Sequence, residues 1–248
     1  MAEPLRIARF LARAGVTSRR NAEKMIVDGR VTVNGQVLVS FHHKVSSGDD
    51  VRVDGKSVAA PEPPMLWRFH KPAGFVTTTS DEKGRPNVFE LLPPELPRVL
   101  SVGRLDLNSE GLLLLTNDGG LKRLLELPAN GFSRGYRVRA KGHPSEASLD
   151  LLRQGVRIGD EQFRPMTVDV ERQNASNCWL SVQLTEGRNR EIRRTFAAIG
   201  LTVGRLIRVS FGPFRLGQLA PGDVRRISDS DIAGLFPDIA WSAGEYWF

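Results

Sequence analysis

The chain has 248 residues, of which 40% are hydrophobic and 25% are charged, a composition that excludes a largely disordered protein. No stretch approaches the roughly 20 apolar residues that a membrane-spanning helix needs, and the arginine-interrupted N-terminus excludes a secretory signal. A single cysteine, Cys178, excludes an intrachain disulfide. We therefore expect a protein of the reducing cytoplasm that has no membrane segment.

The net charge of +7 is concentrated in two parts of the sequence. Residues 1–60 hold ten Lys or Arg against six Asp or Glu, and residues 186–208 hold six Arg against two Glu. Two separate basic regions predict a polyanion that is bound at two places. Solvated charged helices give the same pattern, so charge alone leaves both interpretations open.

The first 60 residues predict a small helix and strand unit. Apolar residues at helical spacing indicate a first helix that ends before Gly15. Ser18 is a typical N-cap and predicts a second helix that ends at Gly29. Alternating valines on both sides of Asn34-Gly35 predict a β-hairpin, and another short strand and turn are expected at residues 51–55.

A proline-rich segment follows this unit. Pro61, Pro63 and Pro64 stand within four residues, which favours an extended and semi-rigid spacer. We therefore expect a small domain over residues 1–60, a linker over 61–65 and a larger domain over 66–248.

The larger domain reads as an α+β domain rich in strands. Short apolar or alternating runs predict buried and half-exposed strands at residues 99–102, 112–115, 136–140 and 179–184. A short helix is expected from Leu121 after the turn at residues 117–120. Asn189 is expected to cap a second helix that ends at Gly200.

Several motifs are missing, which narrows the chemistry. The sequence has neither a phosphate-binding glycine loop nor the glycine fingerprint of dinucleotide-binding proteins. Its four scattered histidines and one cysteine have no metal-ligand spacing. We expect no metal and no nucleotide cofactor, so any chemistry must come from carboxylates, arginines and the few aromatic residues.

The most informative stretch is residues 103–116. Asp106 lies there between apolar runs, which predicts a loop held against the core. A partly buried carboxylate needs a cationic partner to stay ionised, and Arg104 or the arginines of residues 186–208 can supply one. The pattern alone also fits a surface ion pair without catalytic function.

The N-terminal segment resembles an S4 RNA-binding domain over residues 5–57. The resemblance rests on residues 10–15, 18–20, 29–35 and 48–50. It implies RNA binding without chemistry, because S4 domains also occur in proteins that are not enzymes. The basic residues expected to contact RNA are Arg6, Arg9, Arg13, Arg19, Arg20 and Lys24.

The larger domain resembles the RsuA/RluB group of pseudouridine synthases. Residues 103–112 match the group's Gly-Arg-Leu-Asp signature, and three flanking blocks, at residues 70–74, 84–93 and 186–194, follow in the right order. The resemblance implies isomerisation of uridine to pseudouridine in RNA, with no cofactor. It also implies a catalytic domain built on a mixed, mainly antiparallel sheet flanked by helices.

The resemblance assigns roles to individual positions. Asp106 matches the essential aspartate, Tyr136 the aromatic that stacks on the uracil, and Arg193 the basic residue that pairs with the aspartate. Arg104 matches the arginine of the same signature, and Ile192 matches an aliphatic residue behind the tyrosine ring. Further RNA contacts are expected from Lys71, Arg188, Arg190 and Arg194.

Two positions depart from the group's pattern. Arg134 stands where the group usually has lysine, and Leu201 stands where many members have histidine. Arginine keeps the charge but changes the hydrogen-bond geometry, so the contacts around Arg134 are expected to differ.

The expected partner is ribosomal RNA or a pre-ribosomal particle, bound by a monomer. The block at residues 85–93 is more similar to members that act on large-subunit RNA than to those that act on small-subunit RNA. Small-subunit RNA and transfer RNA remain alternative substrates. A non-catalytic RNA-binding or ribosome-assembly factor is the alternative from another class, and the Asp106, Tyr136 and Arg193 set argues against it.

Overall fold

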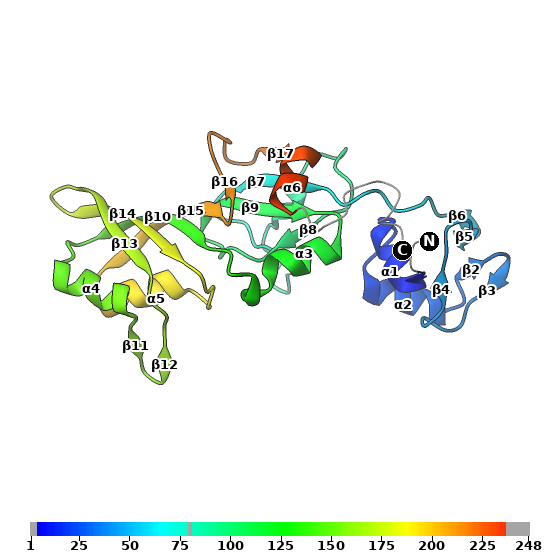
Figure 1. Cartoon of the computed structure of the whole chain (residues 1–248), viewed down its shortest axis with the longest axis horizontal. Helices are drawn as coiled ribbons and strands as arrows, with labels where there is room; N and C mark the ends of the chain where they lie inside the picture. Colours follow the sequence, from blue (N-terminus) through cyan, green and yellow to red (C-terminus); the bar gives the residue numbers. More distant parts are fainter. Residues whose placement is uncertain (1–3, 79–80, 237–248) are drawn as a thin grey trace.

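The computed structural model describes residues 4–78 and 81–236, and residues 1–3, 79–80 and 237–248 lie outside the description. Figure 1 shows a small N-terminal unit, coloured blue, beside a longer unit built on one large sheet. Among the described residues, no helix is long and apolar enough to cross a membrane.

Two helices cover one side of the N-terminal unit, as the sequence predicts. They are α1, Ile7–Arg13, and α2, Arg19–Val27. Ser18 caps α2 because its hydroxyl accepts a hydrogen bond from the Asn21 amide at 3.2 Å. The buried sides of both helices pack against valines of the neighbouring strands, which gives this unit an apolar core of its own.

The strands of the N-terminal unit are short. Four form one sheet in the order β3-β2-β5-β6, and β1 pairs with β4; their bounds are Leu5–Arg6 (β1), Val31–Val33 (β2), Gln36–Val37 (β3), Lys44–Val45 (β4), Val51–Val53 (β5) and Lys56–Ser57 (β6). Asn34 and Gly35 have φ angles of +50° and +80°, as a tight hairpin turn between β2 and β3 requires. The predicted hairpin is therefore confirmed.

One mixed sheet forms the centre of the larger unit. Its main path runs β13-β14-β10-β15-β9-β7-β17, with β16 on β15 and β8 on β9. The bounds are Leu66–Lys71 (β7), Leu100–Val102 (β8), Glu110–Thr116 (β9), Arg134–Lys141 (β10), Thr167–Gln173 (β13), Asn177–Leu184 (β14), Thr202–Phe211 (β15), Phe214–Arg215 (β16) and Val224–Arg226 (β17). The strands predicted at four places are confirmed, and so is the mixed, mainly antiparallel architecture.

The parallel pairing of β9 with β15 joins the two halves of this sheet. Ile207 lies opposite Glu110, and Arg208 lies opposite Gly111. A Cβ atom at residue 111 would stand 2.3 Å from the Arg208 carbonyl oxygen, and Gly111 has a φ of +101°. Only glycine can occupy this position. The close approach of β9 to β15 brings the loop before β9 next to β10 and β15.

Helices cover the sheet over two apolar clusters. The helices α4, Glu146–Gln154, and α5, Glu191–Ala198, pack on the half formed by β10, β13, β14 and β15. The helices α3, Gly119–Glu126, and α6, Asp229–Leu235, pack on the half that contains β9. The remaining elements are the 3-10 helices η1, Val88–Leu91, and η2, Pro128–Asn130, and the hairpin strands β11, Arg157–Ile158, and β12, Glu161–Gln162.

The start of α5 differs from the prediction. Asn189 does not cap the helix, because the N-cap position is taken by Arg190, whose backbone is left-handed with a φ of +50°. A side-chain hydrogen bond at the start of α5 comes instead from Glu191, whose carboxylate accepts from the Arg188 amide at 3.0 Å. Gly200 ends the helix as predicted.

A buried ion pair connects the two units. Arg13 Nε of α1 lies 3.1 Å from Asp118 Oδ2, and the two side chains are only 8% and 6% exposed. Asp118 also caps α3, where it accepts a hydrogen bond from the Leu121 amide at 2.8 Å. The prediction that Arg13 contacts RNA is therefore wrong, because its guanidinium is used in this contact between the units.

We expect the Arg13–Asp118 pair to couple the units energetically. In a double-mutant cycle with Arg13→Met and Asp118→Asn, the coupling energy in urea unfolding should be about 0.5–3 kcal/mol. Asparagine keeps the capping oxygen, so the cycle reports the ion pair. The exposed pair Arg30–Asp54, 47% and 49% exposed, is the matched control and should give at most about 1 kcal/mol. Equal coupling in both cycles would contradict the expectation.

Candidate active site

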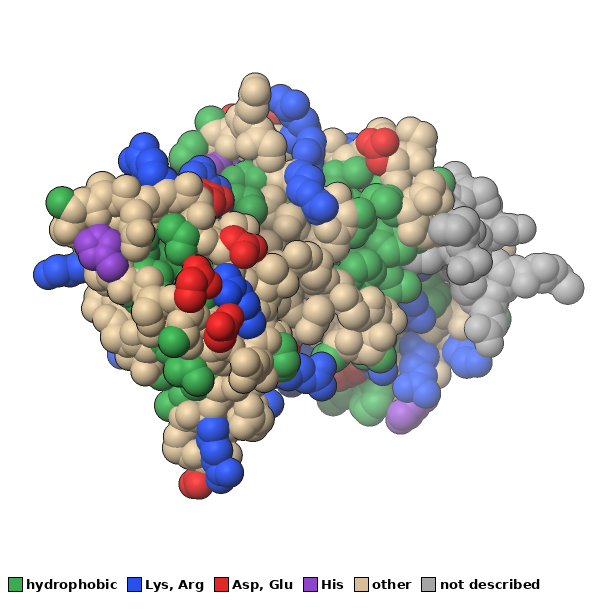
Figure 2. All heavy atoms as spheres, turned by 60° about the vertical axis from the view of Figure 1, so that its left-hand side comes forward, with side chains coloured by type: hydrophobic (Ala, Val, Ile, Leu, Met, Phe, Trp, Pro, Cys, Tyr) green, Lys and Arg blue, Asp and Glu red, His purple; other side chains and the backbone are tan. Residues whose placement is uncertain are grey.

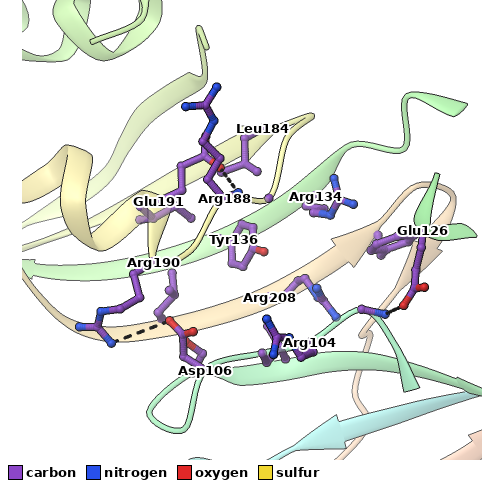
Figure 3. A pocket seen from close by; sticks show the side chains of 17 residues that line it. Arg104, Asp106, Glu126, Arg134, Tyr136, Leu184, Arg188, Arg190, Glu191 and Arg208 are labelled. Carbon is purple, nitrogen blue, oxygen red and sulfur yellow. Dashed lines mark hydrogen bonds and ion pairs between the residues drawn. The ribbon is translucent and has the colours of Figure 1, made fainter. Parts of the chain in front are cut away.

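A cavity of about 160 Å³ lies where the two halves of the sheet meet. Its wall contains the loop at residues 103–109, strands β10 and β15, and the loop that leads into α5 (Figure 3). The predicted site residues found in this wall are Arg104, Asp106, Tyr136, Arg188, Arg190 and Ile192. Residues far apart in the sequence thus form one small and strongly charged pocket.

A buried lysine anchors the loop that carries Asp106. Lys71 Nζ donates hydrogen bonds to the carbonyl oxygens of Pro72 at 3.0 Å, Leu107 at 3.3 Å and Ser109 at 2.8 Å. Burial lowers the pKa of Lys71 to about 8, although the attraction of Asp106 and Glu110 opposes the shift. Lys71 is 0% exposed, so the prediction that it contacts RNA is wrong.

Two further contacts fix the same loop. The Thr77 hydroxyl donates to the Leu105 carbonyl at 3.0 Å, and Glu126 of α3 accepts from the Gly103 amide at 2.6 Å. Glu126 also pairs with Lys122. Because both ends of the loop are held in this way, Asp106 is presented on a rigid support beside the cavity.

The Asp106 carboxylate stands at the edge of the cavity among arginines. Its side chain is 32% exposed, and Arg190 Nη1 lies 4.0 Å from Asp106 Oδ2 (Figure 3). Arg193, the predicted partner, instead donates to the backbone carbonyls of Asn108 at 3.0 Å and Val203 at 2.8 Å. Burial lowers the pKa of Arg193 and Arg190 adds to this shift, while the Asp106 carboxylate opposes it.

Tyr136 lies across the cavity from this loop. It belongs to β10, opposite Val182 on β14 and Arg208 on β15. Its ring packs against both apolar clusters that border the cavity, one of which contains Ile192 and Leu206. The aromatic ring therefore has one side in apolar contact, while the residue still lines the cavity.

Arg134 holds the loop before α5 in place. Its Nη1 donates to the carbonyl oxygens of Thr185 at 2.9 Å and Glu186 at 3.4 Å, and its guanidinium lies 5.0 Å from the centre of the Phe211 ring. A lysine has one nitrogen and no planar face for such a ring contact. Arg134 therefore makes a ring contact that the lysine usual in the group could not make at this position.

Two glutamates shape the loop at residues 186–191. Glu186 accepts from the Arg164 amide at 2.8 Å and from Arg188 Nε at 3.1 Å. Burial raises the pKa of Glu191 to about 7, and repulsion from Glu186 adds to the shift. Glu191 is 4% exposed and lines the cavity, so a titrating carboxyl stands directly behind Arg188 and Arg190.

The other basic residues predicted to bind RNA are mostly accessible. The S4-like unit exposes Arg6, Arg9, Arg19, Arg20 and Lys24. Arg188 and Arg194 lie at 5.4 Å and 4.8 Å from the centre of the Phe163 ring, and Arg194 also pairs with Glu161. Among the described residues, no group of three or more His, Cys, Asp or Glu is arranged to hold a metal ion.

Sequence reasoning missed several residues of the cavity, among them Glu126, Glu191 and Arg208. Glu191 stands inside the block at residues 186–194, and the sequence gives no sign that its side chain is buried. Arg208 follows Leu206 and Ile207 on β15, where it counted only toward the basic character of residues 186–208. The alternation along β15 was the signal that could have placed Leu206 and Arg208 on one face of the sheet.

Comparisons with known proteins identify the family of this chain. The model of the family described as RNA pseudouridylate synthase matches residues 66–198, and an S4 domain model matches residues 5–51. The chain belongs to the RNA pseudouridylate synthase family. It is an RNA pseudouridine synthase with an N-terminal S4 domain, which confirms both resemblances found in the sequence.

Relatives cover most of this synthase. An uncharacterized RNA pseudouridine synthase of Rickettsia prowazekii is 45% identical over 90% of this chain and 94% of its own. The ribosomal large subunit pseudouridine synthase B of Salmonella typhi is 39% identical over 87% of this chain and 76% of its own. A crystal structure of a pseudouridylate synthase matches with a TM-score of 0.63 and 27% identity, and it covers 93% of this chain and 99% of the other.

The raised pKa of Glu191 predicts how stability changes with pH. Between its ordinary value of 4.5 and about 7, the folded protein keeps a proton that the unfolded chain has released. The free energy of unfolding should therefore fall as the pH rises through this window. Glu191→Gln cannot titrate, so the synthase carrying it should lose less stability from pH 5 to pH 7.

Thermal unfolding at a series of pH values measures this difference. The exposed Glu95→Gln is the matched control and should follow the wild-type curve. Parallel curves for Glu191→Gln and the wild type would contradict the proposed burial of this carboxyl.

Proposed function

We propose that this synthase isomerises one uridine of large-subunit ribosomal RNA, with Asp106 as the catalytic carboxylate. The observation that carries the proposal is the meeting of Asp106, Tyr136 and several arginines in one small cavity. The Salmonella relative is named as a ribosomal large subunit enzyme, which supports this RNA as the substrate. The single cysteine, Cys178, is buried as a thiol in the sheet, which fits action in the cytoplasm.

The reaction requires that the target base leave its stack. Unstacking a base from folded nucleic acid costs a few kcal/mol, and enzymes that act on the base offset this cost through stacking and backbone contacts. Tyr136 offers the aromatic surface for the uracil. The exposed arginines of the S4 domain and of residues 188–194 offer the contacts to phosphates.

A second and larger cavity adjoins the first and can receive the flanking nucleotides. It measures about 770 Å³ and shares the Asp106 loop and the loop at residues 187–190 with the smaller cavity. Arg85 and Lys122 line it in addition to those shared loops. Excess positive charge along such a groove suits the sugar-phosphate chain on either side of the flipped base.

The bond changes follow from this placement. The N1–C1′ bond breaks with its electron pair on the uracil, and the Asp106 carboxylate stabilises the positive charge that develops at C1′. The uracil turns in the cavity, and the C5–C1′ bond forms. Tyr136, as its phenolate, then takes the proton from C5, and N1 takes up a proton from solvent, so the product is an isomer of the substrate.

We expect Asp106→Asn to remove catalysis and retain RNA binding. The amide has nearly the same shape but no charge to stabilise C1′, so pseudouridine formation should fall by more than about 10²-fold. The assay is release of tritium from [5-³H]uridine in transcripts of large-subunit RNA. Asp150→Asn is the matched control, because Asp150 is exposed on α4 and pairs with Arg153 at 2.9 Å. Figure 2 shows acidic and basic side chains side by side on one face of the molecule.

The same assay with small-subunit RNA and transfer RNA tests the substrate. Large-subunit RNA should be modified at one uridine, located by mapping the pseudouridines in the product, and the other two should stay unmodified. Undiminished tritium release by Asp106→Asn would overturn the catalytic role. Modification of small-subunit RNA or transfer RNA in place of large-subunit RNA would overturn the substrate proposal alone.

A further inference from the structure

Arg208 is a buried cation in the wall of the small cavity. Its side chain is 2% exposed, and its Nε donates to the Leu112 carbonyl at 2.7 Å. Its Nη2 is buried too and has no hydrogen-bond partner among residues 4–78 and 81–236. Burying a charged group without full pairing lowers the free energy of unfolding. We therefore expect Arg208 to serve a purpose other than stabilising the fold.

Among the described residues, the Tyr136 hydroxyl is a side-chain oxygen that interacts favourably with this guanidinium. The Phe211 ring lies 5.5 Å away, and Arg134 lies over the same ring and adds positive charge. Glu126 lines the cavity but is already bonded to the Gly103 amide and to Lys122. Burial lowers the pKa of Arg208, and interaction with the Tyr136 hydroxyl is what opposes that shift.

The fold places Arg208 and Tyr136 directly against each other. They are register partners on the antiparallel strands β15 and β10, next to a bulge in the pairing between Gly135 and Tyr136. In Figure 3 the phenol oxygen of Tyr136 lies on the side of the ring that faces Arg134 and Arg208. The hydrogen bond to Leu112 fixes the guanidinium, so its remaining nitrogens stay at this side of the cavity.

We infer that Arg208 is a positioning residue that orients the Tyr136 hydroxyl and stabilises its ionised form for removal of the C5 proton. The inference rests on the proposed function, which gives Tyr136 this proton. The phenol first releases its own proton to solvent. In the step, the phenolate oxygen then bonds to the C5 proton, the C5–H electron pair becomes the C5–C6 double bond, and the N1–C6 π pair moves to N1, which takes up a proton from solvent. The guanidinium compensates the negative charge of the phenolate before the transfer.

The test compares proton removal with the earlier bond changes. RNA containing [5-²H]uridine and ordinary uridine is converted by the wild type, Arg208→Lys and Arg208→Gln under single-turnover conditions. We expect Arg208→Gln to slow pseudouridine formation by about 10²-fold and to show a larger deuterium isotope effect than the wild type. Arg208→Lys keeps the cation and should recover a large part of the rate, with an intermediate isotope effect.

Matched measurements separate this role from a merely structural one. Arg139→Gln removes an exposed arginine from β10 and should leave the rate and the isotope effect unchanged. RNA affinity and the thermal unfolding midpoint of Arg208→Lys should stay close to the wild type. A rate loss in both Arg208 variants with the wild-type isotope effect would overturn the inference, and so would wild-type rates.

Tyr136→Phe distinguishes failure of the inference from failure of the proposed function. If Tyr136→Phe forms pseudouridine at the wild-type rate, the proton-accepting role of Tyr136 is wrong and Arg208 loses its purpose. If Tyr136→Phe is inactive and the isotope effect is the same in the wild type and the Arg208 variants, only the role of Arg208 is wrong.

Discussion

The ammonium group of Lys71 is fully buried and donates hydrogen bonds to three backbone carbonyls around the loop that carries Asp106. Burying a cation without partners costs free energy, and here carbonyl dipoles and two nearby carboxylates offset that cost. The loop thereby gains a fixed path from β8 to β9. The position of Asp106, and with it the form of the cavity, depends on this buried contact.

The sheet supplies the other constraint. The parallel crossing of β9 and β15 at Gly111 brings the Asp106 loop to β10 and to the loop before α5, although these segments are separated by up to 80 residues or so of chain. Glu126 of α3 then holds Gly103, while Asp118 at the other end of α3 pairs with Arg13 of the S4 domain. One short helix thus contacts both the active-site loop and the RNA-binding unit.

The sequence predicted most elements because their signals are local. The Ser18 cap, the Asn34-Gly35 turn and the alternating residues around Tyr136 each depend on a few neighbours. Asp106, Tyr136 and the arginines could be named from motif resemblance. Their pairing could not, because whether Arg190 or Arg193 faces the carboxylate depends on the left-handed backbone at Arg190. Lys71 and Arg13 were misread for a similar reason, since a basic residue looks alike in sequence whether it is buried or exposed.

A crystal structure of the Asp106→Asn variant with a ribosomal RNA fragment that contains the target uridine tests the central claim most directly. The account predicts that the uracil is flipped out of its stack and lies on the Tyr136 ring, with C1′ next to residue 106. A complex in which the uridine stays stacked in the RNA, or binds away from Asp106 and Tyr136, would contradict the account.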